Sequence, residues 1–286
     1  MNTNRILFAG MYDSGKTTFI AALWAYVNSD KKDKHLKLNT LANSENEYLD
    51  TIRAEWLQCK KVTRTNLNKT ENVKMNLLNE SNSENVILEI PDISGELFSN
   101  HFQSRECTSE YDSLVNQING ILLFINPNDK KNRTNFIADS LEIEKELGGT
   151  PENNENVNFA TWSEEQTSNQ VKLVETLQFI EARKDIVTPI KVSVIVSRWD
   201  LIEEEECPSP EKWLQTNMPL LYQYLKCNTN YFKPSYFGVS AQGCDYDNQD
   251  DIDKMLDVEP FERPFIRLEN EVIKDLTAPI IWLTEK

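Results

Sequence analysis

The sequence lacks the features that usually indicate a metal centre, a disulfide framework or a membrane span. Its five cysteines are scattered without a CxxC pair, and the 286 residues include only two histidines. Such a pattern is typical of reduced thiols. No apolar run approaches ~18 residues, and no basic segment followed by an apolar core opens the chain. We therefore expect a cytoplasmic protein without a membrane span.

Basic charge is also scarce. Lys and Arg number 30 against 46 Asp and Glu, which gives a net charge of −16, and no basic cluster is long enough to follow a phosphate backbone. Nucleic acid is therefore not an expected partner. The acidic excess is typical of a soluble surface, and we interpret the acidic run 203–206 in the same way.

Hydrophobic patterning predicts alternating strands and helices. The expected strands are 5–10, 72–79, 85–90, 120–125, 190–196 and 236–239. The expected helices are 16–27, 44–61, 136–147, 170–184 and 263–275. This order favours an α/β fold with a mainly parallel sheet, one antiparallel strand and helices on both faces. Length alone allows one enlarged domain or two small ones. We expect a single domain over 1–286, with a helical insertion near 44–61 and a second insertion near 126–169.

One segment fits the phosphate-binding pattern G-x-x-x-x-G-K-[ST]. It reads GMYDSGKTT and lies between an expected strand and an expected helix, which is the context the motif requires. Backbone N–H groups would surround the phosphates, Lys16 would reach the β- and γ-phosphates, and the Thr17 hydroxyl would hold Mg²⁺. A chance match on a glycine-containing turn is the alternative, and the flanking elements argue against it. The expected phosphate residues are Gly10, Asp13, Ser14, Gly15, Lys16, Thr17 and Thr18.

Three further loops follow expected strands. The strand 85–90 runs into PDISG, which places Asp92 where Mg²⁺ and its waters would lie and Gly95 beside the phosphates. Alone, a D-x-x-G pattern is weak, because Asp and Gly are common in turns. The strands 190–196 and 236–239 run into SRWD (197–200) and SAQG (240–243). Both loops fall at the carboxyl ends of strands, where doubly wound sheets bind ligands.

These four segments, in this order, resemble the P-loop GTPases of the Ras-like (TRAFAC) class, and the expected fold is their G domain. The resemblance implies that Asp200 accepts hydrogen bonds from the guanine ring N–H and amino group, and that Ala241 donates its backbone N–H to the guanine oxygen. Ser197 and Ser240 begin the two base-reading loops. Arg198 replaces the usual Lys, Ser197 replaces Asn or Thr, and Gln242 replaces Lys. Arg198 could still stack on a purine. Guanine is expected, and adenine remains the alternative.

The resemblance also suggests catalytic residues. Glu96 stands where the family commonly has a water-orienting Gln, and its carboxylate could orient the attacking water or merely repel the γ-phosphate. Thr65 and Thr70, with Thr63 behind them, are candidates for the switch I threonine that closes over Mg²⁺. Arg64 could act as an internal arginine finger or be an ordinary surface residue. Tyr12 and Asp13 occupy places where many members have Gly, which leaves less room near the γ-phosphate.

A narrower resemblance rests on DSGKTT, the Trp-containing helix before Thr65, the RWD loop and the terminal APIIWL. Together they are similar to bacterial double-GTPase proteins. That implies a paired GTPase with a second GTPase or regulator as partner, in predicted conflict or anti-phage systems. The expected function is a regulatory switch that binds GTP with Mg²⁺ and hydrolyses it to GDP. The alternatives are a nucleotide-binding scaffold with little turnover and an ATP-using P-loop protein.

Overall fold

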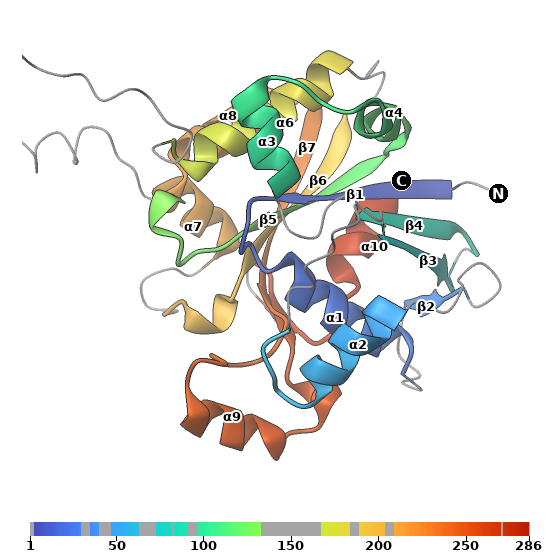
Figure 1. The fold of residues 1–286 in the computed structure, drawn as a ribbon, viewed down its shortest axis with the longest axis vertical. Coiled ribbons are helices and arrows are strands. Elements are labelled where there is room, and N and C mark those ends of the chain that lie inside the picture. The colour runs from blue at the N-terminus through green and yellow to red at the C-terminus, as the bar shows by residue number, and fades with distance from the viewer. Residues whose placement is uncertain are drawn as a thin grey trace, which may run out of the picture.

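A computed structural model describes residues 3–29, 35–39, 47–62, 73–81, 83–90, 96–132, 167–183, 189–203, 209–269 and 271–285. Within these ranges one mixed sheet has the strand order β2-β3-β4-β1-β5-β6-β7-β8-β9 (Figure 1). The strands are β1 Thr3–Gly10, β2 Leu36–Leu38, β3 Val73–Asn79, β4 Asn85–Ile90, β5 Gly120–Ile125, β6 Ile190–Ser197, β7 Phe232–Ser240, β8 Phe265–Arg267 and β9 Val272–Ile273.

The middle of the sheet is parallel, as predicted. Strands β4, β1, β5, β6 and β7 run in one direction. Every residue of β5 is buried, which explains why its sequence GILLFI is apolar throughout rather than alternating. The expected antiparallel strand is β3, which pairs with β4 as a hairpin. The structure adds a second one at the other side of the sheet, where β8 runs antiparallel to both β7 and β9.

The prediction of a helix over 263–275 is wrong. Pro264 does not by itself exclude that helix, because proline is tolerated in a first helical turn. The segment instead forms β8 and β9. Ile266 of β8 is fully buried, and β8 pairs with Gly238–Ser240 at the edge of β7. Covering that edge with a short strand satisfies backbone groups that a helix would leave to water.

Helices cover both faces of the sheet, as predicted. On one face α1, α2 and α10 share a core with the strands, and on the other face α3, α4, α6, α7 and α8 do so (Figure 1). The helix α9 buries none of its residues. The expected helix 136–147 lies outside the described residues. The helices are α1 Lys16–Val27, α2 Glu47–Leu57, α3 Glu96–Ser104, α4 Ser109–Gln117, α6 Asn169–Arg183, α7 Pro210–Asn217, α8 Pro219–Cys227, α9 Gln249–Leu256 and α10 Ala278–Thr284.

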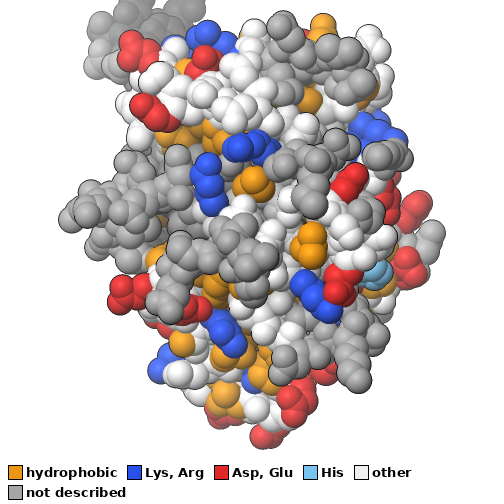
Figure 2. Space-filling model, turned by 90° about the vertical axis from the view of Figure 1, so that its right-hand side faces the viewer, with side chains coloured by type: hydrophobic (Ala, Val, Ile, Leu, Met, Phe, Trp, Pro, Cys, Tyr) orange, Lys and Arg blue, Asp and Glu red, His pale blue; other side chains and the backbone are white. Residues whose placement is uncertain are grey.

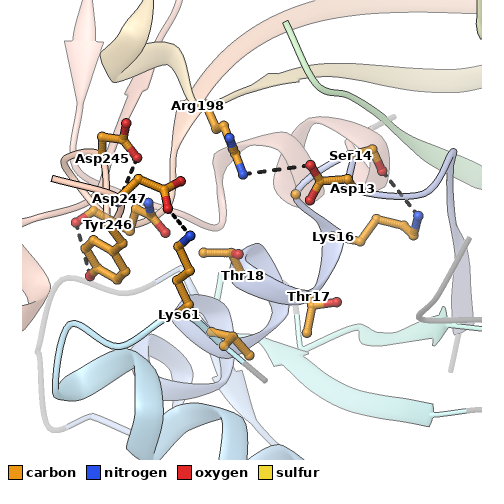
Figure 3. Close-up of a pocket in the computed structure, with 13 residues that line it drawn as sticks. Asp13, Ser14, Lys16, Thr17, Thr18, Lys61, Arg198, Asp245, Tyr246 and Asp247 are labelled. Atoms are coloured by element: carbon orange, nitrogen blue, oxygen red, sulfur yellow. Dashed lines mark hydrogen bonds and ion pairs between the residues drawn. The ribbon is translucent and has the colours of Figure 1, made fainter. Parts of the chain in front are cut away.

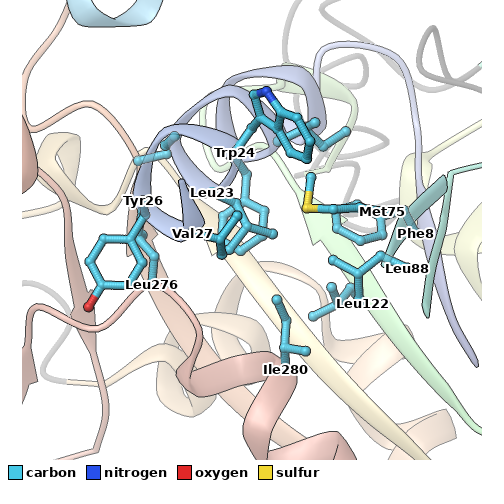
Figure 4. Packing of buried hydrophobic residues seen from close by; sticks show 14 of the residues in the cluster. Phe8, Leu23, Trp24, Tyr26, Val27, Met75, Leu88, Leu122, Leu276 and Ile280 are labelled. Carbon is cyan, nitrogen blue, oxygen red and sulfur yellow. The ribbon is translucent and has the colours of Figure 1, made fainter. Parts of the chain in front are cut away.

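The helix α1 is apolar on nearly all sides because it lies between the sheet and α2. Leu23 and Val27 pack with strand residues such as Met75 and Leu122 (Figure 4). On its outer side, the Trp24 indole Nε1 donates to Asp50 Oδ1 of α2 at 2.9 Å. The extra helix predicted in 44–61 is therefore a structural layer over α1. Its described part is Glu47–Leu57, and residues 44–46 lie outside the described residues.

The apolar segment at the end of the sequence packs on the sheet. Ile280 and Leu283 of α10 are buried in the same core as α1. The Ser193 hydroxyl of β6 donates to Pro279 O at 2.8 Å, and Lys191 Nζ donates to Trp282 O at 2.8 Å. The apolar character of this segment is therefore explained by its packing on the sheet of the same chain.

The interval 126–169 is described only at its two ends, and these lie side by side. The Asn169 amide donates to Asp129 Oδ2 at 2.7 Å and to Asn132 Oδ1 at 3.0 Å. The described residues on the two sides of 133–166 are therefore close together, and the insertion expected near 126–169 stays a prediction.

The surface charge is mixed. On the face shown in Figure 2, Lys and Arg side chains are dispersed among acidic ones. No helix among the described residues is long and apolar enough to cross a bilayer.

Candidate functional site

The candidate site lies where the sheet changes its direction of winding. The strand β1 has β4 on one side and β5 on the other, so successive units of the chain are added to opposite sides of β1. In open α/β sheets such a switch point leaves a crevice at the carboxyl ends of the strands. The loops that follow β1, β5, β6 and β7 all meet there.

The loop after β1 wraps around a lysine of the helix that follows. Lys16 is 3% exposed, and its Nζ donates to Gly10 O at 2.7 Å, Met11 O at 2.9 Å and Ser14 Oγ at 3.2 Å. The residues Asp13 and Gly15 both have positive φ, of 57° and 88°. Backbone of this kind forms the concave N–H clusters that bind anions. Lys16 also begins α1, whose first turn contains no acidic residue to neutralise its positive end.

Glycine is required at both ends of this loop. At Gly10, φ is 149° and a Cβ would lie 2.7 Å from Phe124 O. At Gly15, a Cβ would lie 2.8 Å from the Cβ of Ser197. The Ser197 hydroxyl in turn donates to Ile125 O at 2.9 Å. Ser197, which replaces the family's Asn or Thr, therefore joins the loops after β5 and β6 to the loop 10–15, which we call the phosphate-type loop.

A cavity of about 520 Å³ opens over this loop. Such a volume is typical of small-molecule sites. The side chains of Thr17 and Thr18 border it from α1, and Arg198 reaches over it from the loop after β6 (Figure 3). The opposite wall is the segment Asp245, Tyr246 and Asp247, where Asp247 forms an ion pair with Lys61. The lining residues are Asp13, Ser14, Gly15, Lys16, Thr17, Thr18, Lys61, Val62, Arg198, Gln242, Asp245, Tyr246 and Asp247.

A second, narrower hollow of about 60 Å³ adjoins this cavity, and both are bordered by Gly15, Thr18 and Arg198. Its apolar walls are Phe19, Phe124, Ile195, Val239 and Ala241, and its polar lining residues are Asp13, Thr18, Ser197, Arg198, Asp200 and Gln242. A slot that combines apolar walls with polar groups is suited to a flat heterocycle.

The carboxylate of Asp200 is the most unusual polar group in the slot. Both of its oxygens are buried, and neither accepts a hydrogen bond of normal geometry from the described residues. Burial raises the pKa of this carboxyl group, and the nearby Ser240 hydroxyl, the backbone and Arg198 lower it to a smaller extent. A buried anion without donors is costly, so the site favours a ligand that brings N–H groups to it.

The turn that carries Asp200 is held from several directions. Arg198 adopts a left-handed φ of 48°, and its Nη2 lies 3.9 Å from Asp13 Oδ2. The Asn126 amide, after β5, donates to the same Asp13 oxygen at 3.3 Å. The Trp199 ring is buried against Gly238 so closely that a Cβ there would collide with it. The guanidinium is thereby kept beside the phosphate-type loop.

The loop after β7 completes the slot. The Ser240 hydroxyl accepts from the Gly243 N–H at 2.9 Å, and Gly243 has a φ of 90°. The carbonyl of Ala241 accepts from the buried indole Nε1 of Trp56 at 2.8 Å.

The sequence analysis did not predict Trp56, Asn126, Lys61 and 245–247 as site residues. No spacing rule connects Trp56 with Ala241, which is 185 residues further along the chain.

The structure brings most of the predicted binding residues to one place. Some predictions lie outside the described residues and stay predictions: these are Thr63, Arg64, Thr65, Thr70, Asp92 and Gly95. Glu96 begins α3, and the position of its side chain also stays a prediction. The described residues contain no cluster of three or more His, Cys, Asp or Glu that could hold a metal. The Thr17 hydroxyl still suits Mg²⁺, which takes most of its ligands from phosphates and water.

The fold and the site together define a class. A phosphate-type loop at the switch point of a mainly parallel sheet, covered by helices on both faces, is the architecture of a P-loop nucleotide-binding protein. The sequence matches the model of the family Double-GTPase 1 over residues 7–283. The chain belongs to the Double-GTPase 1 family and is therefore a GTP-binding P-loop protein.

No curated protein matches the sequence significantly. Similar solved structures include a bacterial selenocysteine-specific elongation factor, EF-Sec, at 12% identity and TM-score 0.35, covering 90% of this chain and 29% of that one. The Saccharomyces cerevisiae Ski7 GTPase-like domain, bound to GDP and inorganic phosphate, has 16% identity, TM-score 0.42 and coverages of 84% and 43%. The small GTPase Arl6 from Trypanosoma brucei, with a bound nucleotide analogue, has 8% identity, TM-score 0.36 and coverages of 92% and 99%. The chain thus spans less than half the length of the first two.

Proposed function

We propose that this chain binds GTP with Mg²⁺ at the crevice after β1, hydrolyses it to GDP and acts as a regulatory switch. The observation that carries the choice of base is the buried Asp200 carboxylate, whose two oxygens lack donors among the described residues. Guanine presents two adjacent donors, its ring N–H and its 2-amino group. Adenine offers an acceptor at the corresponding ring nitrogen, which would face the carboxylate with lone pairs.

In this proposal the phosphates lie over the loop 10–15. Lys16 would exchange its present acceptors, the carbonyls of Gly10 and Met11, for β- and γ-phosphate oxygens. The Thr17 hydroxyl, with Asp92 proposed as a further ligand, would hold Mg²⁺, whose charge offsets that of the phosphates. Ser14, Gly15 and Thr18 line the same cavity. Asp13 and Gly10 would shape the loop.

Turnover is assigned to residues near the γ-phosphate. Glu96 would orient the attacking water from the first turn of α3, and Thr65 or Thr70 would close over Mg²⁺. When GTP is hydrolysed, the segments that contact the γ-phosphate would be released, which changes the surface offered to a partner. A second GTPase or a regulator is the proposed partner, in keeping with the double-GTPase family. The family resemblance places such a pair in bacterial conflict or anti-phage systems.

The experiment begins with protein purified without added nucleotide, followed by identification of what remains bound. Calorimetric titration with GTP and ATP in Mg²⁺ then gives the base preference, and single-turnover phosphate release gives hydrolysis. We expect GTP to bind more tightly than ATP. Tighter ATP binding would overturn the guanine assignment. Phosphate release no faster than in buffer would reduce the protein to a nucleotide-holding subunit.

The matched variants are Lys16→Ala and Lys172→Ala. Both lysines are 3% exposed, but Lys172 lies on α6, away from the crevice. Loss of a charge-assisted contact to the phosphates should weaken GTP binding by Lys16→Ala at least about tenfold, since hydrogen bonds to charged groups contribute ~1.5–3 kcal/mol. The Lys172→Ala variant should bind GTP like the parent. Equal affinities in the two variants would contradict the proposed phosphate site.

A further inference from the structure

The helix α2 is attached directly to the loop that follows β7. Trp56, in its last turn, is completely buried, and its indole Nε1 donates to Ala241 O at 2.8 Å. Ala241 lines the narrow slot together with Asp200. A helix that the sequence presents as an insertion therefore holds a loop of the candidate base site.

A second attachment lies at the carboxyl end of the same helix. Arg263 is 5% exposed, and its Nη1 donates to Leu57 O at 3.1 Å while its Nε donates to Val258 O at 3.0 Å. Carbonyls at the end of a helix lack partners within it and carry partial negative charge, so a cation is stabilised there. At Gly243, which has a φ of 90°, a Cβ would lie 2.8 Å from Arg263 O. The loop 241–243 is thus enclosed between Trp56 and Arg263.

The chain leaves α2 toward the phosphate cavity. Cys59 adopts a left-handed φ of 52°, with its N–H bonded to Trp56 O and that of Lys60 to Glu55 O, each at 3.0 Å. This pair of hydrogen bonds is the Schellman motif, which ends many helices. Lys61 then pairs with Asp247, although both side chains are more than half exposed, so that pair contributes little to holding the loop. The buried indole bond and Arg263 remain the main attachments.

We infer that Trp56 is a positioning residue for base recognition, acting through Ala241. By holding the Ala241 carbonyl, the indole fixes the peptide plane between Ala241 and Gln242 and so restrains the loop 241–243. The Ala241 N–H, in the peptide just before this plane, faces the guanine oxygen in the proposed function on which this inference rests. Asp200 reads the other side of the same ring edge from a separate turn. Removing the indole N–H should therefore weaken recognition of the guanine oxygen and leave recognition of the 2-amino group unchanged.

The test compares the parent and Trp56→Phe with three nucleotides in calorimetric titrations. GTP has both features, ITP lacks the 2-amino group, and 6-thio-GTP replaces the oxygen by sulfur, a weak acceptor. Trp56→Phe should bind GTP and ITP about tenfold more weakly, the loss expected for one buried hydrogen bond. Its affinity for 6-thio-GTP should fall much less, so the preference for GTP over 6-thio-GTP shrinks while the ratio of GTP to ITP stays constant.

Trp24→Phe is the matched control, because Trp24 Nε1 also donates to a partner across α2, Asp50 Oδ1 at 2.9 Å, but far from the base loop. It should lower the thermal midpoint and preserve all three affinity ratios. Equal losses for GTP and 6-thio-GTP in Trp56→Phe, or no loss at all, would overturn the inference. If Trp56→Phe does not fold, Arg263→Lys loosens the same loop and must show the same pattern. A parent protein that does not prefer GTP to ATP would instead contradict the proposed function.

Discussion

Asp200 is the residue at which folding and function oppose each other. Its carboxylate is buried without donors from the described residues, and burial raises its pKa. Burial disfavours its charged form, and the nearby Ser240 hydroxyl, the backbone and Arg198 offset this only in part, so the ionised carboxylate destabilises the nucleotide-free fold. Such an arrangement is typical of functional positions, where a ligand completes what the fold leaves unpaired. The same residue therefore offers a test that needs no nucleotide.

The first prediction concerns the stability of the nucleotide-free protein. A carboxyl group whose pKa is raised by folding makes its full contribution to stability below its unfolded pKa of about 3.9, and this contribution is lost as the pH rises through the folded value. Asp200→Asn should therefore raise the thermal midpoint at pH 7, by about 2–4 °C for each kcal/mol recovered. The gain should shrink as the pH is lowered toward 4.

The control for this prediction is Asp253→Asn on α9, where the side chain is exposed. That variant changes the net charge of the chain by the same amount as Asp200→Asn does. Its thermal midpoint should stay near that of the parent at every pH. A gain that is equal in the two variants would mean that the net charge of the chain, rather than burial at Asp200, is responsible.

At the scale of elements, α10 tests how the fold supports the site. Ile280 is completely buried against the core shared with α1, whereas the neighbouring Ile281 is only partly buried. Because α10 packs on β5 and β6, it stabilises the strands whose carboxyl ends carry Asn126 and Ser197. Loss of packing at α10 should lower stability without touching the crevice.

The second prediction is that Ile280→Ala lowers the free energy of unfolding by about 2–5 kcal/mol, the usual cost of truncating a buried isoleucine. Ile281→Ala should cost clearly less. Urea unfolding of both variants measures the difference. Similar losses would show that α10 does not pack as described, and an unchanged GTP affinity in folded Ile280→Ala would separate stability from binding.

Elements with a strong local pattern could be predicted from the sequence. The helix 16–27 and the buried strands 120–125 and 190–196 were predicted within a residue or so of their bounds. Their apolar residues follow the period of a helix or form a continuous run, and turn residues end them. The short helices α3, α4, α7 and α8 were not predicted, because eight or nine residues give too few turns for a clear period. The segment 263–275 depends on pairing with β7, which no local pattern shows.

At the scale of the whole molecule, the phosphate-type loop could be predicted because its chemistry is encoded in one short segment. Asp200 and Ala241 could be predicted only with the family resemblance, since single residues after strands carry little information by themselves. Trp56 and Lys61 belong to the site because the chain folds back over 185 and 186 residues to contact the loop 241–247. Such contacts arise from tertiary packing, so no period or motif in the sequence indicates them.

The central claim is that the carboxylate of Asp200 selects guanine. The most direct measurement is a calorimetric comparison of GTP and XTP binding by the parent and by Asp200→Asn. Xanthine carries an oxygen where guanine has its 2-amino group, and an asparagine amide can donate to that oxygen while accepting from the ring N–H. Two charge-assisted hydrogen bonds are at stake, so GTP affinity should fall at least about 10²-fold in the variant. XTP should then bind the variant more tightly than GTP does. Unchanged GTP affinity in Asp200→Asn would contradict the account.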